Sequence, residues 1–117
     1  MTPIPDFLIQ ALRAQYGEAL VEKILAGYTC ARPVTLRVNT LKATPEEIQK
    51  KLTQAGLRWE RVAWSPEALV LPDCRESQLE ALPMYQQGEI YLQSLSSMLP
   101  PLFLQPQAGD NVLDMAA

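Results

Sequence analysis

The residues that could support ligand chemistry most directly stand at the C-terminal end of the sequence, where Asp114 is followed by Met115, Ala116 and Ala117. Residues Asn111 to Met115 read as a buried strand. A buried strand that ends in Asp and small residues is typical of a tight turn into a helix, and the backbone N–H groups of such a turn approach a ligand closely. The pattern therefore predicts the beginning of a nucleotide-type binding site, with the turn and its helix expected beyond the last residue.

A second group of residues with binding potential lies in the first half of the chain. Arg37 and Asn39 share the polar face of a predicted strand, and Arg32 and Lys42 flank it. An arginine side chain suits bidentate contact with a phosphate or a carboxylate, and an asparagine can bridge backbone groups. The alternative is a solvated strand face with an ordinary ion pair, and the sequence leaves this choice open.

The two cysteines do not predict a catalytic or metal site. Cys30 and Cys74 lie far apart, and the sequence contains no histidine. Neither a zinc site nor a cysteine–histidine pair can therefore form within the chain, and both residues are predicted to be plain thiols. No catalytic residue and no metal ligand is predicted here.

Composition limits the class of protein. The chain has 117 residues, of which 48% are hydrophobic and 20% charged, as expected of a small globular protein. A net charge of −3 argues against a strong free-standing nucleic-acid binder, because such binding depends on neutralising phosphates. The N-terminus lacks the layout of a signal peptide, and no apolar run approaches the length of a membrane span. A cytoplasmic location without a membrane partner is expected.

Three motifs carry a resemblance to a known family. They are Gly88-x-Ile-Tyr-x-Gln-x-x-Ser-Ser-Met-Leu, Gly109-Asp-x-Val-Leu-Asp-Met-Ala-Ala and, upstream, Arg37-Val-Asn-Thr-Leu-Lys42. Their order and spacing resemble the region leading into the methyltransferase domain of the Sun-type (RsmB/RsmF-like) RNA cytosine-5 methyltransferases. Together with the helix that begins at Pro5, the resemblance covers nearly the whole chain.

The resemblance implies a cofactor, and it implies that the catalytic residues lie outside this chain. It implies S-adenosylmethionine as the methyl donor, with Asp114 supporting the cofactor loop and the backbone of Ala116 and Ala117 contacting the cofactor. In the family the two catalytic cysteines lie in motifs downstream of that loop, so neither Cys30 nor Cys74 takes their role. The chain is therefore expected to end just inside the catalytic domain, to be inactive alone and not to bind the cofactor tightly.

The resemblance also implies partners. RNA, in particular ribosomal RNA, is the expected substrate of the whole enzyme, and Arg32, Arg37, Asn39 and Lys42 are expected to contact either RNA or the catalytic domain. A chain that stops at this point could also self-associate without physiological meaning. Two other functions stay open: a substrate lid of a different Rossmann-type methyltransferase, and a stand-alone RRM-like protein-interaction module.

The predicted fold class is α+β. Two N-terminal helices precede an RRM-like or ferredoxin-like βαββαβ domain, which is followed by the first helix and strand of a Rossmann-like methyltransferase domain. The corresponding domains are residues 1–29, 30–93 and 94–117. The predicted helices are Pro5 to Gly17, Glu18 to Ala26, a helix capped by Thr44 and closed by Gly56, Glu76 to Leu82 before Pro83, and an apolar run to Leu104. The predicted strands are Val34 to Leu41, Trp59 to Trp64, Ala68 to Leu71 after a Ser65-Pro66-Glu67 turn, and Glu89 to Gln93.

The predicted sheet differs from that of an RNA-reading RRM. RRM domains stack bases on aromatic side chains of the two central strands, and neither Val34 to Leu41 nor Ala68 to Leu71 contains one. Base stacking on these strands is not expected. Trp59, Trp64 and Tyr91 are the remaining aromatic candidates, and packing is the favoured role for each.

Overall fold

The computed structural model describes residues 3–116. Its contacts divide the chain into two units, Met1–Arg32 and Pro33–Ala117. No helix within the described residues is long and apolar enough to cross a membrane. The elements are the helices α1 (Asp6–Tyr16), α2 (Glu18–Gly27), α3 (Pro45–Gln54), α4 (Glu76–Glu80), α5 (Pro83–Gln86) and α6 (Leu99–Leu104), the strands β1 (Val34–Val38), β2 (Glu60–Val62), β3 (Ser65–Leu71) and β4 (Ile90–Leu92), and a 3₁₀ turn at Ser96–Met98.

The first unit is a pair of helices. Gly17 separates α1 from α2 with a φ of +79°, a conformation that glycine adopts without strain. The Gly17 N–H donates to the Arg13 carbonyl at 2.9 Å, and the Arg13 guanidinium pairs with Glu18 at 3.1 Å. Val21 of α2 is fully buried. Both predicted N-terminal helices are confirmed.

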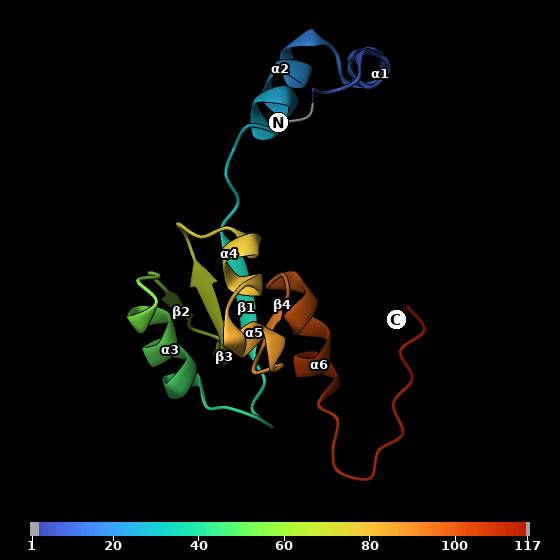
Figure 1. Ribbon diagram of the computed structural model, residues 1–117. Helices are drawn as coiled ribbons and strands as arrows, with labels where there is room; N and C mark the ends of the chain where they lie inside the picture. The colour runs from blue at the N-terminus through green and yellow to red at the C-terminus, as the bar shows by residue number, and fades with distance from the viewer. Residues whose placement is uncertain (1–2, 117) are drawn as a thin grey trace. The chain divides into compact units, whose positions relative to one another are not determined.

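The second unit is built on a four-stranded antiparallel sheet (Figure 1). The strand order is β2-β3-β1-β4, so the two central strands are β3 and β1. Val34 faces Leu71 across the β1–β3 pair, and Val38 faces Ile90 across the β1–β4 pair. With α3 between β1 and β2, and with α4 and α5 between β3 and β4, this is the ferredoxin-like βαββαβ arrangement that the sequence predicted.

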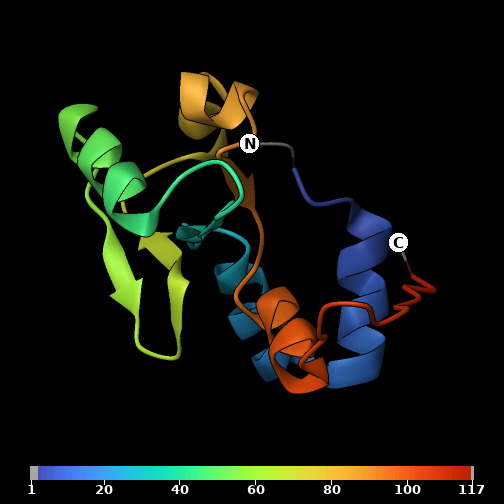
Figure 2. The same cartoon turned by 90° about the horizontal axis from the view of Figure 1, so that it is seen from below.

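One face of this sheet forms the core. The helix α3 and the α4–α5 segment lie on the same side of the sheet, and α6 lies toward the other side (Figure 2). Alternate residues of β1, namely Val34, Leu36 and Val38, point into the core, where they leave no more than 6% of their surface exposed. The core also contains Ala43, Ile48, Leu52, Leu69, Leu71, Cys74, Leu79, Met84 and Ile90.

The helix α3 begins as its sequence predicted. The Thr44 hydroxyl accepts a hydrogen bond from the Glu47 N–H, and the Glu47 carboxylate accepts one from the Thr44 N–H, both at 3.2 Å. This reciprocal capping satisfies two N–H groups that a helix start otherwise leaves without partners. Pro45 occupies the first turn, and Gly56 follows the helix with a φ of +76°.

Several predicted strand boundaries are wrong: β1 ends at Val38 rather than at Leu41, and the hairpin turn is misplaced. Ser65, Pro66 and Glu67 belong to β3, and the turn of the β2–β3 hairpin is Ala63-Trp64. Pro66 is tolerated there because the pairing of β3 with β1 begins only at Ala68, so the missing proline N–H removes no bond to β1.

Pro83 was predicted only to stop a helix, but it also starts one. The helix α4 ends at Glu80, and Pro83 occupies the first turn of α5. The fixed φ of proline suits this position, and the N–H that proline lacks has no partner at a helix start. Pro100 and Pro101 occupy the first turn of α6 in the same way.

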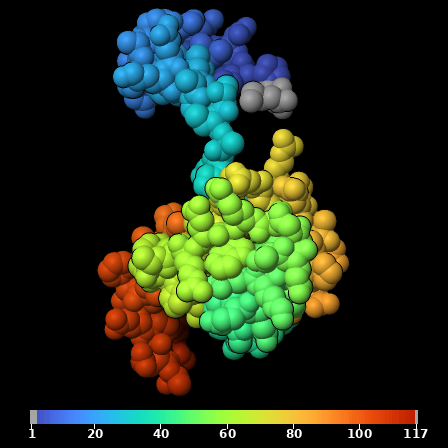
Figure 3. All heavy atoms as spheres, turned by 90° about the vertical axis from the view of Figure 1, so that its left-hand side faces the viewer, coloured from blue at the N-terminus to red at the C-terminus, as the bar shows by residue number. Residues whose placement is uncertain are grey.

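The strand predicted at Asn111 to Met115 is not formed. These residues have no strand assignment in the structure, and Val112, Leu113 and Met115 are 59%, 81% and 91% exposed. A strand needs a neighbour that takes up its backbone N–H and C=O groups, and nothing in residues 3–116 supplies one to this segment. The C-terminal segment therefore projects from the ferredoxin-like unit (Figure 3).

Candidate functional site

A pocket of the ferredoxin-like unit lies at the end of β1, beside the turn that leads into β4. Its volume is about 430 Å³, and its walls include Arg37, Asn39, Thr40, Glu67, Gly88 and Tyr91. Arg37 and Asn39 were both predicted as contact residues, so the structure brings two of the four candidates into one place. Glu67 and Tyr91 come from the neighbouring strands β3 and β4.

Asn39 is engaged inside the protein. Its side-chain Nδ2 donates to the Gly88 carbonyl at 2.9 Å, and its Oδ1 accepts from the Leu41 N–H at 3.2 Å. Its backbone N–H donates to the Glu89 carbonyl at 2.8 Å. The side chain therefore holds the turn after β1 against the turn before β4, and it forms one wall of the pocket.

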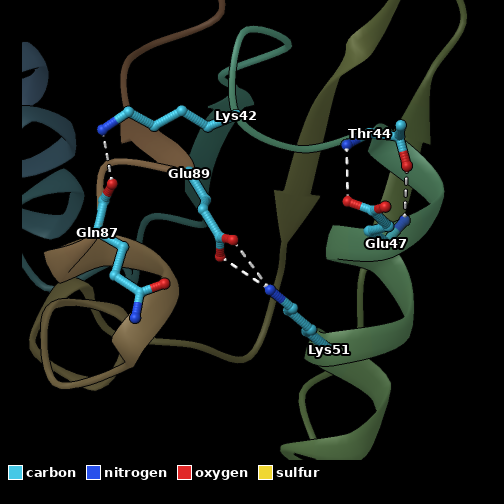
Figure 4. A network of polar contacts seen from close by, with 6 residues as sticks. All are labelled: Lys42, Thr44, Glu47, Lys51, Gln87 and Glu89. Carbon is cyan, nitrogen blue, oxygen red and sulfur yellow. Dashed lines mark hydrogen bonds and ion pairs between the residues drawn. The ribbon is translucent and has the colours of Figure 1, made fainter.

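Lys42 makes a parallel connection between the same two turns (Figure 4). Its Nζ donates to the Gln87 carbonyl at 2.9 Å. Close by, Lys51 of α3 forms an ion pair with Glu89, with an N–O distance of 2.9 Å. A Cβ atom on Gly88 would lie 3.1 Å from the Lys42 Nζ, and Gly88 has a φ of +74°, so glycine fits this position better than any other residue.

Replacement of Asn39 by alanine is expected to destabilise the ferredoxin-like unit by about 1–2 kcal/mol, because it leaves the partly buried Gly88 carbonyl without its donor. Urea unfolding followed by circular dichroism measures the change as a shift in midpoint. Thr40→Ala is the matched control, since Thr40 is exposed and its side chain makes no hydrogen bond within residues 3–116. Equal midpoints for the two variants would show that these bonds add no stability.

Arg37 differs from Asn39 and Lys42. It lies across from Ala68 of β3 on one side and Tyr91 of β4 on the other. It is half-buried, and within the described residues its guanidinium has neither an ion pair nor a hydrogen bond. Tyr91, on the edge strand, is 59% exposed. Of the predicted contact residues in this unit, Arg37 is therefore the one whose side chain stays available for a partner.

The other predicted site residues lie outside this pocket. Arg32 is exposed and ends the first unit. Asp114 accepts a hydrogen bond from the Ala116 N–H at 2.9 Å, which forms a tight turn in the exposed C-terminal segment. Ala117 lies outside the described residues. Residues 114–116 thus supply a carboxylate and a backbone turn, but no walls around a ligand, and within this chain they do not fit a cofactor site.

The serine-rich step before α6 makes hydrogen bonds within the chain. The Ser94 hydroxyl accepts from the Ser97 N–H at 3.4 Å and hydrogen-bonds the Ser97 hydroxyl at 2.7 Å. Gln93 donates from Nε2 to the Ser97 carbonyl at 3.3 Å. These bonds satisfy the start of the 3₁₀ turn and fix the direction in which the chain leaves β4.

Cys74 is a core residue with a weakly acidic thiol. Burial raises the pKa of the Cys74 thiol, and a backbone hydrogen bond from Arg75 only partly offsets this. The thiol also donates to the Arg75 carbonyl at 3.3 Å. A raised pKa reduces the thiolate fraction, and the thiolate is the nucleophile. Cys30, by contrast, is exposed. The structure therefore gives Cys74 a packing role.

Sequence reasoning did not single out Glu67 and gave Tyr91 a packing role. Glu67 was placed in a turn, whereas it belongs to β3 and lines the pocket. The alternation of Ile90, Tyr91 and Leu92 did carry a signal for Tyr91, because its two neighbours are the residues that face the core. No signal in the sequence placed Glu67 near Arg37.

Comparison with known proteins identifies the family. A model of the ferredoxin-like domain of RsmF/B-like methyltransferases matches residues 4–76. The 28S rRNA (cytosine-C(5))-methyltransferase of Mus musculus is 34% identical over 94% of this chain, and the ribosomal RNA small subunit methyltransferase F of Shewanella oneidensis is 37% identical over 75% of it.

The solved structures agree with this assignment. A methyltransferase homologue from Pyrococcus horikoshii is 27% identical, covers 91% of this chain and superimposes with a TM-score of 0.63. The chain spans only 14% and 19% of the mouse and Shewanella proteins and 38% of the Pyrococcus structure. By its fold and by the match over residues 4–76, the chain belongs to the RsmF/B-like methyltransferase family, as the ferredoxin-like domain of that family.

Proposed function

We propose that this chain is the RNA-positioning module of a cytoplasmic ribosomal RNA (cytosine-5) methyltransferase that uses S-adenosylmethionine. The observation that carries the proposal is the family match over residues 4–76, on a chain whose relatives are named as rRNA cytosine-C5 methyltransferases. In this proposal the methyl transfer takes place on a catalytic part outside residues 1–117, and the ferredoxin-like unit holds the RNA beside it.

The chemistry of the described residues favours a role in binding over a role in catalysis. Attack on carbon 6 of cytosine needs a cysteine thiolate, and burial raises the pKa of the Cys74 thiol. S-adenosylmethionine would supply the methyl group, and residues 114–116 lie too exposed to enclose it. The contribution left to this chain is binding and orientation.

The surface around α6 supports docking to a catalytic part. Trp64 of the hairpin turn and Leu99, Leu102 and Phe103 of α6 line an open apolar pocket of about 300 Å³. Phe103 is 83% exposed, and Leu104, next to it, is 61% exposed. Contiguous exposed apolar surface of this kind marks an interaction site. We assign it to the catalytic part, since the relatives are several times longer than this chain.

A consequence is expected for the 117-residue chain in solution. Its α6 surface should drive self-association that increases with protein concentration, because no segment of residues 3–116 covers that surface. The double substitution Leu102→Glu and Phe103→Glu should give a monomer, because it places two charges on that surface. Sedimentation velocity at several concentrations measures this. Leu41→Glu, at an isolated leucine that is 94% exposed, is the matched control and should leave the association unchanged.

A chimera tests the proposed function. This chain replaces the matching region of the Shewanella oneidensis ribosomal RNA small subunit methyltransferase F, and the chimera is given labelled S-adenosylmethionine and unmethylated ribosomal RNA. We expect 5-methylcytidine in the RNA, whereas deletion of the matching region should raise KM for RNA at least tenfold, on the order expected when several phosphate contacts are lost, and leave cofactor binding intact.

Two outcomes would contradict the proposal. If the deletion leaves KM for RNA unchanged, the module does not position RNA. If the chimera transfers label to a protein or a small molecule instead of RNA, the module is a substrate lid of a different methyltransferase.

A further inference from the structure

Three chemically different residues, Arg37, Glu67 and Tyr91, are among those that line the pocket at the end of β1. The Arg37 guanidinium and the Glu67 carboxylate make no ion pair within residues 3–116, and Tyr91 is 59% exposed. Asn39 and Lys42 are occupied by their bonds to the Gly88 and Gln87 carbonyls. The free groups are thus a cation, an anion and an aromatic ring around about 430 Å³ of space.

We propose that this pocket binds one unstacked nucleotide of the RNA strand, preferentially one whose base carries an exocyclic amino group. The inference rests on the proposed function, and it assigns to the pocket the recognition of a single nucleotide. The base stacks on Tyr91, a phosphate pairs with Arg37, and the amino group donates to the Glu67 carboxylate.

Tyr91 supplies the stacking surface. Proteins that read single-stranded RNA splay a base out and stack it on an aromatic side chain. The central strands β1 and β3 contain no aromatic residue, but Tyr91 stands on the edge strand β4, directly across from Arg37. The edge position leaves the ring open to solvent, where an unstacked base can reach it.

Arg37 supplies the phosphate contact. Its planar fork of N–H donors matches phosphate oxygens, and the side chain is half-buried on the sheet. A partly buried side chain has less rotational freedom to lose when it binds than a fully exposed one. One such contact is weak, which agrees with a net charge of −3 on the whole chain.

Glu67 supplies selectivity. A glutamate carboxylate accepts hydrogen bonds and gives none, so it favours the amino group of cytosine and disfavours the carbonyl oxygen that uracil has at the same position. A phosphate beside Glu67 would be repelled. The pocket is therefore polarised, with the phosphate placed at Arg37 and the base edge at Glu67.

A nucleotide fits this pocket better than a segment of the catalytic part. The apolar surface suited to a protein partner is at α6, around Leu99, Leu102 and Phe103. The pocket at β1 presents unpaired charges of both signs beside one exposed ring, which complements an anionic phosphate, an amino group and a flat base. The unit thus separates its polar binding surface from its apolar one.

A titration tests the proposal. The ¹⁵N-labelled 117-residue chain is followed by NMR at about 50 mM salt, a concentration at which phosphate contacts are strong, while hexacytidylate or hexauridylate is added. Amide shifts should concentrate at Arg37, Glu67 and Tyr91, and hexacytidylate should bind about three- to tenfold more tightly than hexauridylate. The spectra also report whether each variant is folded.

Substitutions separate the three roles. Tyr91→Ala should weaken hexacytidylate binding about tenfold, whereas Tyr91→Phe should change it less than about twofold. Arg37→Gln should reduce the slope of log K against log salt concentration by about 0.7, the value for one phosphate contact to a single strand, and Arg37→Lys should keep that slope.

Glu67→Gln should make the affinities for hexacytidylate and hexauridylate similar, because an amide both donates and accepts hydrogen bonds. Arg61→Gln and Tyr85→Ala, at exposed residues outside this pocket, are the controls.

The outcomes distinguish this inference from the proposed function. If RNA binds and the pocket variants bind as the wild type does, the pocket is not a nucleotide site, although the module still binds RNA. If neither hexanucleotide shifts these amides, while the chimera methylates RNA and fails with Arg37→Gln, the pocket is a contact to the catalytic part. Selective loss of hexacytidylate binding in the pocket variants alone supports the proposal.

Discussion

Replacing Leu36 by alanine is expected to lower the free energy of unfolding of the ferredoxin-like unit by about 2–5 kcal/mol. Leu36 is at the centre of β1, its side chain is 0% exposed, and it lies between Leu69 of β3 and Leu92 of β4. Truncation removes apolar contacts and leaves a cavity. The strands β1, β3 and β4 cannot move together to fill it, because their hydrogen bonds fix their spacing. Since a small domain is stable by about 5–15 kcal/mol, this loss is a large fraction of the total stability of the unit.

Leu41→Ala provides a control of the same chemical type five positions away. Leu41 is 94% exposed, so its truncation should change the free energy of unfolding by no more than about 0.5 kcal/mol. Chemical denaturation of both variants, followed by circular dichroism and by tryptophan fluorescence, measures the difference. A small effect of Leu36→Ala would mean that the sheet repacks around the cavity, and the core described for this unit would then be wrong.

Cys30 is expected to react with iodoacetamide about a hundredfold faster than Cys74 in the folded protein. Cys30 is exposed, whereas Cys74 is 7% exposed and burial raises the pKa of its thiol. Alkylation of Cys74 therefore requires a local opening, and an opening that costs about 3 kcal/mol leaves roughly one molecule in a hundred reactive. Mass spectrometry of digested samples over time gives both rates.

The direction of the pKa change also predicts a dependence of stability on pH. The folded state favours the neutral thiol, so the stabilisation from this group is complete below the unfolded thiol pKa of about 8.5 and is lost as pH rises through the higher folded value. A Cys74→Ala variant should lose this alkaline sensitivity, and Cys30→Ser should keep it. Equal alkylation rates for the two cysteines, in buffer without denaturant, would contradict the burial of Cys74.

The structure divides the Arg37-Val-Asn-Thr-Leu-Lys42 motif into two roles. Asn39 and Lys42 bind backbone carbonyls at 2.9 Å and hold two turns together, and Val38 packs in the core. Within residues 3–116 the Arg37 guanidinium keeps its charge without an ion pair or a hydrogen bond. Under the proposed function, substitutions at Asn39 and Lys42 should weaken RNA binding by destabilising the fold, whereas substitutions at Arg37 should weaken it by removing a contact. This separation makes Arg37→Gln a more informative variant than Asn39→Ala.

The sequence by itself determined the elements whose signals are local. The capping residues Thr44 and Glu47 lie three positions apart and define the start of α3 whatever surrounds it. Alternation in β1 separated Val34, Leu36 and Val38 from Arg37, and the order of elements predicted the ferredoxin-like arrangement. The family motifs also lie close together in the chain, so their spacing could be read directly.

Only the tertiary structure decided what depends on residues distant in the chain. Whether Arg37 is free or paired depends on which side chains β3 and β4 bring beside it, and Glu67 and Tyr91 are 30 and 54 positions away. Asn39 could have faced a ligand, but the turn at Gly88 supplies a carbonyl for it to bind. Asn111 to Met115 have the composition of a buried strand, yet a strand forms only where a neighbour takes up its backbone hydrogen bonds, and residues 3–116 offer this segment none.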